Sequence, residues 1–331
     1  MAEHIGKFQE IGFSVEDTRG TAETSIQKAA KKIEADFYKQ VEKTEDESVV
    51  ASVADISKLR KVNSVFEGSV SMNLHADTIG YLFSNIFGTV ESESVSEEDI
   101  AYEHDFTLEE SIKRQTLTTF LKEADINQMK VANTVVNTLS LSIDQDDIIS
   151  ADFDLMGTVG ESDSEAFSYD KEYDFIAKNV EVKIANSKAG LSNSNGYCVK
   201  SVDIEIDTGA EPNYCSDGNY EPNDIFQGAL SISIDLNLDY TDDEFKDLYE
   251  GDDEKYMRVN ISDDHELETG VNPEVELTFN KVQVEDWDRD SSQDDVITQD
   301  VTMRASYNED DSEMASARII NSTADYNAPT S

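Results

Sequence analysis

The sequence is poor in the residues that carry most catalytic and metal-binding chemistry. Its 331 residues include 4 histidines, 2 cysteines, 4 prolines and 1 tryptophan. The two cysteines, Cys198 and Cys215, cannot form a disulfide framework, and no closely spaced Cys/His group indicates zinc. We expect both thiols to be free. The histidines are scattered, and neither a GxGxxG nor a Walker-type phosphate loop occurs. Nothing in this pattern points to an enzyme, and no cofactor is expected.

Basic residues and long apolar runs are also scarce. The chain contains only 26 Lys and Arg residues but 72 Asp and Glu residues, which gives a net charge of −46. Because affinity for phosphate comes from Lys and Arg, this balance argues strongly against a surface that binds nucleic acid. No run approaches the roughly 18–20 apolar residues that span a bilayer, and no basic-then-apolar secretory leader is present. We expect a soluble protein made in the cytosol, whose acidity would also suit a salty environment.

The acidic charge is unevenly distributed along the chain. Residues 1–61 hold 10 basic and 12 acidic residues and are therefore close to neutral, whereas the rest carries 16 basic and 60 acidic residues. This first segment is polar and turn-rich and lacks a sustained core pattern. We interpret residues 1–61 as an N-terminal arm and loop.

From Val65 onward, alternation of apolar and polar residues predicts a mainly β protein. Short helices interrupt it only twice. In the first, Ile79, Leu82, Phe83 and Ile86 form an apolar stripe that ends at Gly88, where a C-cap glycine belongs. The predicted strands are residues 65–74, 102–109, 115–122, 131–144, 147–158, 179–186, 197–207, 227–239, 255–262, 274–285, 293–305 and 314–321.

Two pairs of segments indicate an internal duplication. The strand and short helix of residues 68–88 resemble residues 228–251, where a glycine again starts the strand. There we predict Thr241 as the N-cap, with Glu244 at the capping-box position. In addition, DDIISADFDLMG from Asp146 aligns without gaps with DDVITQDVTMRA from Asp294. We infer two β-rich halves, residues 62–160 and 161–331.

Two short motifs raise alternative functions. Asp207-Thr208-Gly209 is the tripeptide of aspartic proteases, but that chemistry needs a second carboxylate, which only a homodimer could supply here. Asp286, Asp288 and Asp290, with Asp294 nearby, resemble a calcium loop, although Ser291 replaces the turn glycine and Ile297 the bidentate glutamate. A calcium-binding β-sandwich adhesion module and a protease using Asp207 therefore remain alternatives, beside a plain strand end and a solvated acidic loop that holds Ca²⁺ or other cations loosely.

Several segments, in order along the chain, resemble the tail tube (major tail) proteins of long-tailed bacteriophages and related archaeal viruses. They are VEDTRGTAETS, FEGSVSMNLHADTIGYLFSNIFG, VKSVDIEID, EPNDIFQGALSISIDLNLDYTDDEFKDLYEG and VELTFNKVQVEDWDRDSSQDDVITQDVTMRASYN. The resemblance implies a β-sandwich or barrel-like subunit that forms hexameric rings stacked into a tube. It also implies tape-measure and tail-tip partners, passage of DNA, assembly in the host cytoplasm, no membrane, and a place in the virion tail. Relative to a minimal member, we expect enlarged loops near residues 40–60, 90–101, 160–172 and 208–224.

The alternation of two strands suggests how such a tube would treat DNA. In VDIEID the apolar residues would face the core, and the acidic residues of both strands would face the opposite way. We hypothesise that this acidic face lines the lumen and repels phosphate; the alternative is that it faces outer solvent. The lumen candidates are Asp203, Glu205, Asp207, Asp235 and Asp239. The arm would contact a neighbouring subunit through Lys28, Lys31, Lys32, Lys39 and Lys43.

Overall fold

Antiparallel strands build most of the chain, as the alternating sequence predicts. The structure is a computed structural model that describes residues 6–46, 58–95, 100–123, 127–172, 174–291 and 296–327. All the predicted strands are present, with ends displaced by a few residues. The first part of the chain contains β1 (Gln9–Val15), β2 (Lys28–Ala30), β3 (Lys32–Asp46), β4 (Lys58–Asn73), α1 (Ala76–Phe87), β5 (Gly88–Ser94), β6 (Tyr102–Leu108), β7 (Leu117–Glu123), β8 (Asn127–Asp144), β9 (Ser150–Gly157) and β10 (Gly160–Ser162).

The second part repeats much of this order, with fewer elements after its main helix. It contains β11 (Val180–Ala185), α2 (Lys188–Leu191), β12 (Val199–Asp207), β13 (Glu211–Asn213), β14 (Asp224–Phe226), β15 (Ser231–Asp239), α3 (Glu244–Glu250), β16 (Lys255–Ser262), β17 (Glu274–Asp290), β18 (Thr298–Ala305) and β19 (Ala315–Asn321). Two single-turn 3₁₀ helices, Gly6–Phe8 and Ala177–Asn179, precede β1 and β11.

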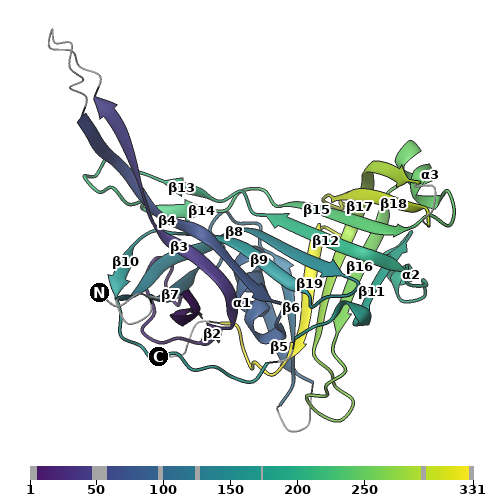
Figure 1. The fold of residues 1–331 in the computed structure, drawn as a ribbon, viewed down its shortest axis with the longest axis horizontal. Helices are drawn as coiled ribbons and strands as arrows, with labels where there is room; N and C mark the ends of the chain where they lie inside the picture. The colour runs from purple at the N-terminus through teal and green to yellow at the C-terminus, as the bar shows by residue number, and fades with distance from the viewer. Residues whose placement is uncertain are drawn as a thin grey trace.

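One continuous antiparallel sheet runs through both parts of the molecule. Its strand order is β3-β4-β9-β8-β12-β15-β18-β17, and we call it the long sheet. In Figure 1 the shared strands β8, β9, β12 and β15 cross the middle of the molecule and connect its two ends. The junction between the two parts is the pairing of β8 with β12, from Asp144 opposite Ser201 to Thr138 opposite Asp207.

The longest strands, β8 and β17, each belong to two sheets. The first half of β8 pairs with β7 and β10, and β7 pairs with β1; its second half lies in the long sheet. In the same way, the first half of β17 pairs with β16 and β19, and β16 pairs with β11. Each strand changes sheet at a β-bulge, which bends a strand and increases its twist. Each part is therefore a small sandwich with one strand common to both layers.

These pairings support the duplication inferred from the sequence. Val136 pairs with Leu155 and Val284 with Met303, and these two pairs are related by the same displacement as Asp146 and Asp294. The bulge that follows Val136 recurs after Val284. Two further bulges recur in the same way, at the starts of β3 and β12 and of β7 and β16. Bulges shared at equivalent positions are what a copied strand framework would retain.

Two details of the predicted duplication need correction. The glycines that start the two strand-helix segments are not equivalent, because Val70 pairs with Phe153 whereas the equivalent of Phe153, Val301, pairs with Leu236. Aligning the glycines would place Leu230 there instead. Furthermore, residues 1–61 do not form a separate arm, since β1 pairs with β7 as β11 pairs with β16, and β3 pairs with β4 as β12 pairs with β15. The boundary near residue 160 stays a prediction.

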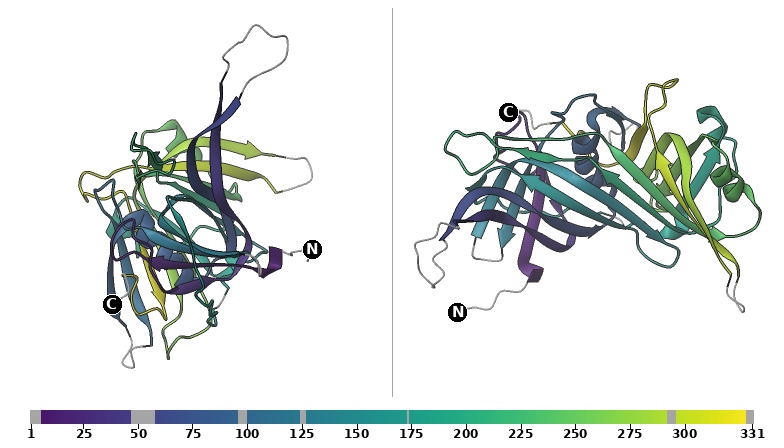
Figure 2. Two further views of the ribbon diagram at one scale, coloured as in Figure 1. Left: turned by 90° about the vertical axis from the view of Figure 1, so that its left-hand side faces the viewer. Right: turned by 90° about the horizontal axis from the view of Figure 1, so that it is seen from above.

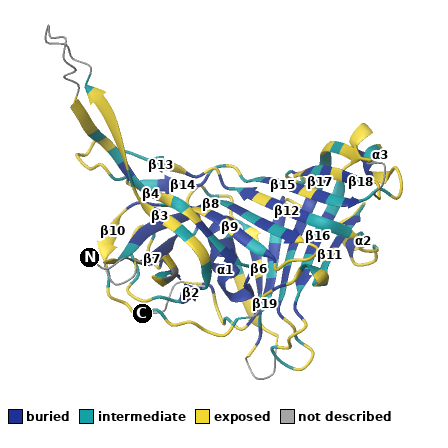
Figure 3. Cartoon of the chain, in the orientation of Figure 1, coloured by how far each residue is buried: buried dark blue, intermediate teal, exposed yellow. Residues whose placement is uncertain are grey.

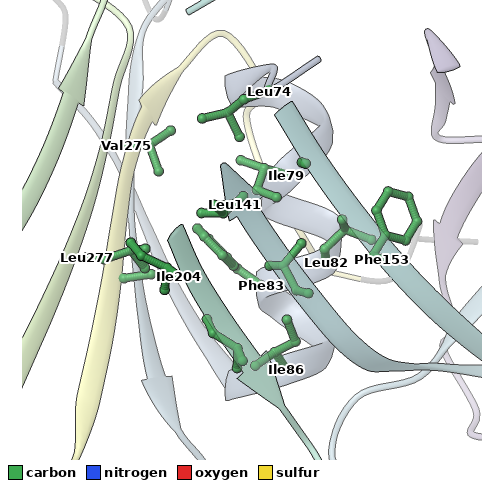
Figure 4. Packing of buried hydrophobic residues seen from close by; sticks show 14 of the residues in the cluster. Leu74, Ile79, Leu82, Phe83, Ile86, Leu141, Phe153, Ile204, Val275 and Leu277 are labelled. Atoms are coloured by element: carbon green, nitrogen blue, oxygen red, sulfur yellow. The ribbon is translucent and has the colours of Figure 1, made fainter. Parts of the chain in front are cut away.

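Helix α1 is the centre of the hydrophobic core. All twelve of its residues are buried, including the predicted stripe, and Gly88 ends it in the left-handed conformation at φ 90°. The ring of Phe83 in this helix contacts the rings of Phe87 and Phe106, at centroid distances of 5.8 and 5.9 Å. Figure 4 shows the stripe facing strands of the long sheet on one side and β19 and β17 on the other, and Figure 3 shows the resulting buried centre.

The second helix is shorter than predicted and starts later. Helix α3 begins at Glu244, so Thr241 is not its N-cap. Instead, the Glu244 backbone N–H is satisfied by Asp242 Oδ1 at 3.1 Å. Phe245 and Leu248 are buried, whereas Tyr249 is exposed. Asp243 occupies the N-cap position, and its side chain makes no capping hydrogen bond.

A buried carboxylate holds the N-terminal segment against the first sandwich. Glu16 accepts hydrogen bonds from the backbone N–H groups of Gly20 and Asn133 and from the hydroxyls of Thr116 and Thr118. Burial raises the pKa of Glu16, and these four donors oppose the rise. The contacts explain why VEDTRGT lies in the body of the molecule and is not a free arm.

Replacement of Phe83 by alanine should cost about 3–5 kcal/mol of unfolding free energy, because it leaves a cavity around a fully buried ring. The matched control is Tyr249→Ala in α3, where the ring is 43% exposed and the change should stay within about 0.5 kcal/mol. Urea unfolding of the dispersed protein measures both. Equal, small effects of the two substitutions would contradict a core centred on α1.

Candidate functional site

The exposed side of the long sheet is an acidic surface with few cations. On β12, Val202, Ile204 and Ile206 are buried, whereas Asp203 and Glu205 are exposed, as the alternation predicts. We call the side of the long sheet that carries Asp203 and Glu205 the polar face. Register places all five predicted acidic residues on it, the others being Asp207, Asp235 and Asp239.

Acidic residues alternate with hydroxyls across the strands as well as along them. One row runs Ser71, Asp152, Ser140, Glu205, Ser233, and a second runs Ser69, Asp154, Thr138, Asp207, Ser231. A hydroxyl-bearing strand therefore separates each pair of carboxylates. This spacing keeps a high density of negative charge while it avoids direct like-charge contacts, which destabilise a sheet.

Neutral donors, more than cations, hold the carboxylates of the polar face. The Ser142 hydroxyl donates to Asp203 at 2.6 Å, and the Thr138 hydroxyl donates to Asp154 at 2.7 Å. Lys200 does pair with Asp239 at 2.7 Å, and Arg304 stands at one end of a row. Because a hydroxyl fixes a carboxylate without cancelling its charge, the face keeps a negative potential that repels phosphate groups.

Asp203 and Asp235 break the alternation, since they lie directly opposite each other on β12 and β15. Each accepts a hydrogen bond from a hydroxyl on its other side, Asp203 from Ser142 and Asp235 from Thr302. A directly opposed pair of like charges is unfavourable.

Sequence reasoning missed part of this face. Asp152 and Asp154 on β9 are exposed and lie in the rows of Glu205 and Asp207, and the exposed Asp300 on β18 lies opposite Asn237 on the same face. The signal was available, because ADFDLMG alternates aspartate with buried Phe153 and Leu155 as VDIEID alternates with isoleucine. The serine and threonine positions between the acids carry no signal of their own, since only register shows them to share the face.

The five lysines assigned to the arm have different environments. Lys28 is 6% exposed and pairs with the buried Glu172 at 2.9 Å, and Lys31 approaches the same carboxylate at 3.7 Å. Lys32 is half-buried, and desolvation lowers its pKa. These lysines serve contacts inside the chain, so Lys28 in particular is not available to a neighbouring subunit. The correction follows from β2, which the sequence analysis did not predict.

The other two lysines lie on a hairpin that projects from the body. Strands β3 and β4 pair along their whole length and extend away from the sandwiches, as the two perpendicular views in Figure 2 show. Lys39 pairs with Glu221 near its base and lowers the pKa of that carboxyl to about 2. Lys43 lies farther out, opposite Lys61. Exposed apolar side chains accompany them, namely Val41, Leu59 and Val62.

Asp207 has the surroundings of a turn residue. Its Oδ1 accepts a hydrogen bond from Gly209 N at 2.7 Å, and Gly209 takes φ +57°. Its cross-strand neighbours are Thr138 and Ser231, so no second carboxylate lies opposite it to share a proton. This geometry is that of a strand end followed by a turn and supplies no aspartic-protease dyad.

Three of the four residues of the proposed calcium loop lie in a strand. Asp286, Asp288 and Asp290 lie in the extended strand β17, paired with β18, and not in a loop that could wrap an ion. Asp294 falls outside the described residues. Among the described residues, no group of three or more His, Cys, Asp or Glu side chains could hold a metal ion. Both thiols, Cys198 and Cys215, are free and exposed.

The fold and this face define a class of β protein: a duplicated sandwich whose shared sheet presents one long acidic surface. The family model of phage tail tube proteins matches residues 9–305, and the chain belongs to that family. It is thus a structural protein of the virion tail. A search of curated proteins finds no match. No helix in the described ranges is long and apolar enough to cross a membrane.

Replacement of Asp235 by asparagine should stabilise the subunit by about 0.2–1 kcal/mol at low salt, because it removes the repulsion from Asp203 and keeps an acceptor for Thr302. The gain should shrink at 1 M salt, where the screening length falls to about 3 Å. The matched control is Asp152→Asn, whose cross-strand neighbours are Ser71 and Ser140. Thermal melting of the unmodified protein and the two variants tests this prediction. Equal shifts in melting temperature for both variants would contradict a specific Asp203–Asp235 repulsion.

Proposed function

We propose that the chain assembles into rings that stack as the tail tube, with the polar face of the long sheet lining the channel through which the genome passes. The observation that carries the proposal is the contrast between the two sides of this sheet. One side is buried against α1 and the second layers, whereas the other is a continuous surface of carboxylates and hydroxyls. Membership of the tail tube family gives such a surface a use.

The channel assignment follows from the physical demands of moving DNA. A wall that bound phosphate would hold the genome in place, and one that repels it lets the polymer slide. Carboxylates do the repelling, while serine and threonine hydroxyls present a wetted surface between them. Cations that collect near such a wall would act as mobile counter-ions, so a dedicated Ca²⁺ site is not required.

The ring itself follows from the open ends of the long sheet. Unpaired strand edges are sites of association, and a closed ring removes them. Hexameric rings are the arrangement that the family resemblance implies, with tape-measure and tail-tip proteins as partners and assembly in the host cytoplasm. In this arrangement the β3–β4 hairpin, with Lys43 and its exposed apolar residues, contacts a neighbouring subunit or ring.

Assembly should depend on salt, because a net charge of −46 makes subunits repel one another unless the charge is screened. Negative-stain electron microscopy of the purified protein should show dispersed subunits at low salt and rings or hollow tubes at high salt. Dispersed subunits at every salt concentration, even after seeding with fragments of isolated tails, would contradict the proposal.

Replacement of Asp203, Glu205 and Asp207 by lysine should leave tubes intact but slow genome ejection, because the channel wall then attracts phosphate. The matched control places the same charge change on loops outside the long sheet, at the exposed Asp252, Asp253 and Asp264. Ejection from virions carrying each variant is followed by the release of DNA to a dye. Unchanged ejection in the first variant, with normal tubes, would show that the polar face does not line the channel.

A further inference from the structure

The long sheet ends in two strands that each have one unpaired edge. Among the described residues, β3 pairs only with β4, and residues 283–290 of β17 pair only with β18. Both edges are more exposed than the interior strands; Tyr38 on β3, for example, is 47% exposed. Proteins usually protect long free edges, since they pair with other chains.

The molecule already contains a contact between the same two kinds of edge. Strand β8 is the last strand of the first copy in the long sheet, and β12 is the first strand of the second copy. They pair antiparallel over seven residues of each strand, from Ser201 opposite Asp144 to Asp207 opposite Thr138. By the equivalences established above, β17 corresponds to β8 and β3 corresponds to β12. The free edges are thus the unpaired counterparts of the internal junction.

Because the bulges occur at equivalent positions in the two copies, each residue of the free edges can be matched to one residue of the internal junction. The bulge near the start of β3 matches that of β12, which makes Tyr38 the counterpart of Glu205. The bulge after Val284 matches that after Val136, which makes Asp288 the counterpart of Ser140. Because Glu205 lies opposite Ser140, the transferred register places Tyr38 opposite Asp288.

We propose that the free edge of β3 in one chain pairs antiparallel with the free edge of β17 in the next chain, in the register that sets Tyr38 opposite Asp288. The contact is head-to-tail, so it leaves a new pair of free edges at each step until a ring closes. This inference rests on the proposed ring assembly and names its interface. It continues the polar face from chain to chain, with Tyr38 and Asp288 on that side.

The core-facing positions of this interface differ in chemistry from those of the internal junction. Inside the chain, the inward positions pair Ile204 with Leu141 and Ile206 with Leu139. The transferred register replaces these apolar pairs with Phe37 opposite Arg289 and Lys39 opposite Trp287. Cations stack favourably on aromatic rings, and they keep a free edge soluble before assembly.

A groove beside β3 lies at the edge with which the incoming strand would pair. It lies between β3 and the ends of β1, β7 and β8 and is lined by Glu10, Ala35, Phe37, Leu121, Glu123 and Met129, among others. Its apolar residues suit the inward side chains of a strand, and its carboxylates suit the guanidinium of Arg289. The lining of the groove and the transferred register therefore both favour a second copy of this chain as the occupant.

Disulfide trapping tests the register directly. In a background with Cys198→Ser and Cys215→Ser, the pair Tyr38→Cys and Asp288→Cys should cross-link neighbouring chains when assembled protein is oxidised. The monomer band should be lost to a ladder of multimers on a non-reducing gel. Two controls match it: Glu205→Cys with Ser140→Cys should close within one chain at the internal junction, and Gln40→Cys with Asp290→Cys, four residues out of register, should give no ladder.

Amide hydrogen exchange of the unmodified protein provides a second measurement that no substitution can disturb. Exchange in residues 34–40 and 283–290 should slow when subunits assemble. Tubes without a ladder from Tyr38→Cys/Asp288→Cys, or with unchanged exchange at both edges, would overturn this interface and leave the proposed function standing. Failure of the unmodified protein to form rings under any condition would overturn both.

Discussion

The backbone pairing of β8 with β12 is the contact on which the rest of the architecture depends. It joins two small sandwiches through one sheet, so that eight strands share a single curved surface. Without it, each copy would expose two free edges, and the polar face would be divided in two. The hydrogen bonds of this junction also fix the relative register of the copies, which is why the acidic residues of β9 and β12 fall into common rows.

Alternation along each strand, together with the bulges in β8 and β17, gives the long sheet one buried face and one charged face. Apolar residues at every second position close the core over α1, while the positions between them are free to carry charge. A bulge lets β8 and β17 leave the long sheet and enter a second layer, which covers the apolar side without a separate domain. One strand framework thereby supplies both a stable interior and a highly charged exterior.

The sequence predicts the parts of this arrangement that rest on periodicity. The strands from Val65 onward, the stripe of α1 and the five acidic residues of β12 and β15 are visible in that way. Elements that lack a buried face escaped notice, above all β3, which is exposed on both sides over most of its length. Strand β1 is short and mostly buried on both faces, so it shows no alternation, and its burial depends on β7 and α1, which are distant in sequence. Cross-strand partners of the acids depend on register, which no local pattern specifies.

The β3–β4 hairpin has no free counterpart in the second copy. The equivalent segment, between β12 and β15, folds back onto the first copy, where Glu221 meets Lys39 and Asp224 meets Arg19 and Lys113. Around the proposed ring, the sandwiches therefore alternate between one that carries a projecting β3–β4 hairpin and one that does not. A following ring can engage this ring only at steps of one whole chain, so duplication halves the number of rotational settings in which successive rings fit together.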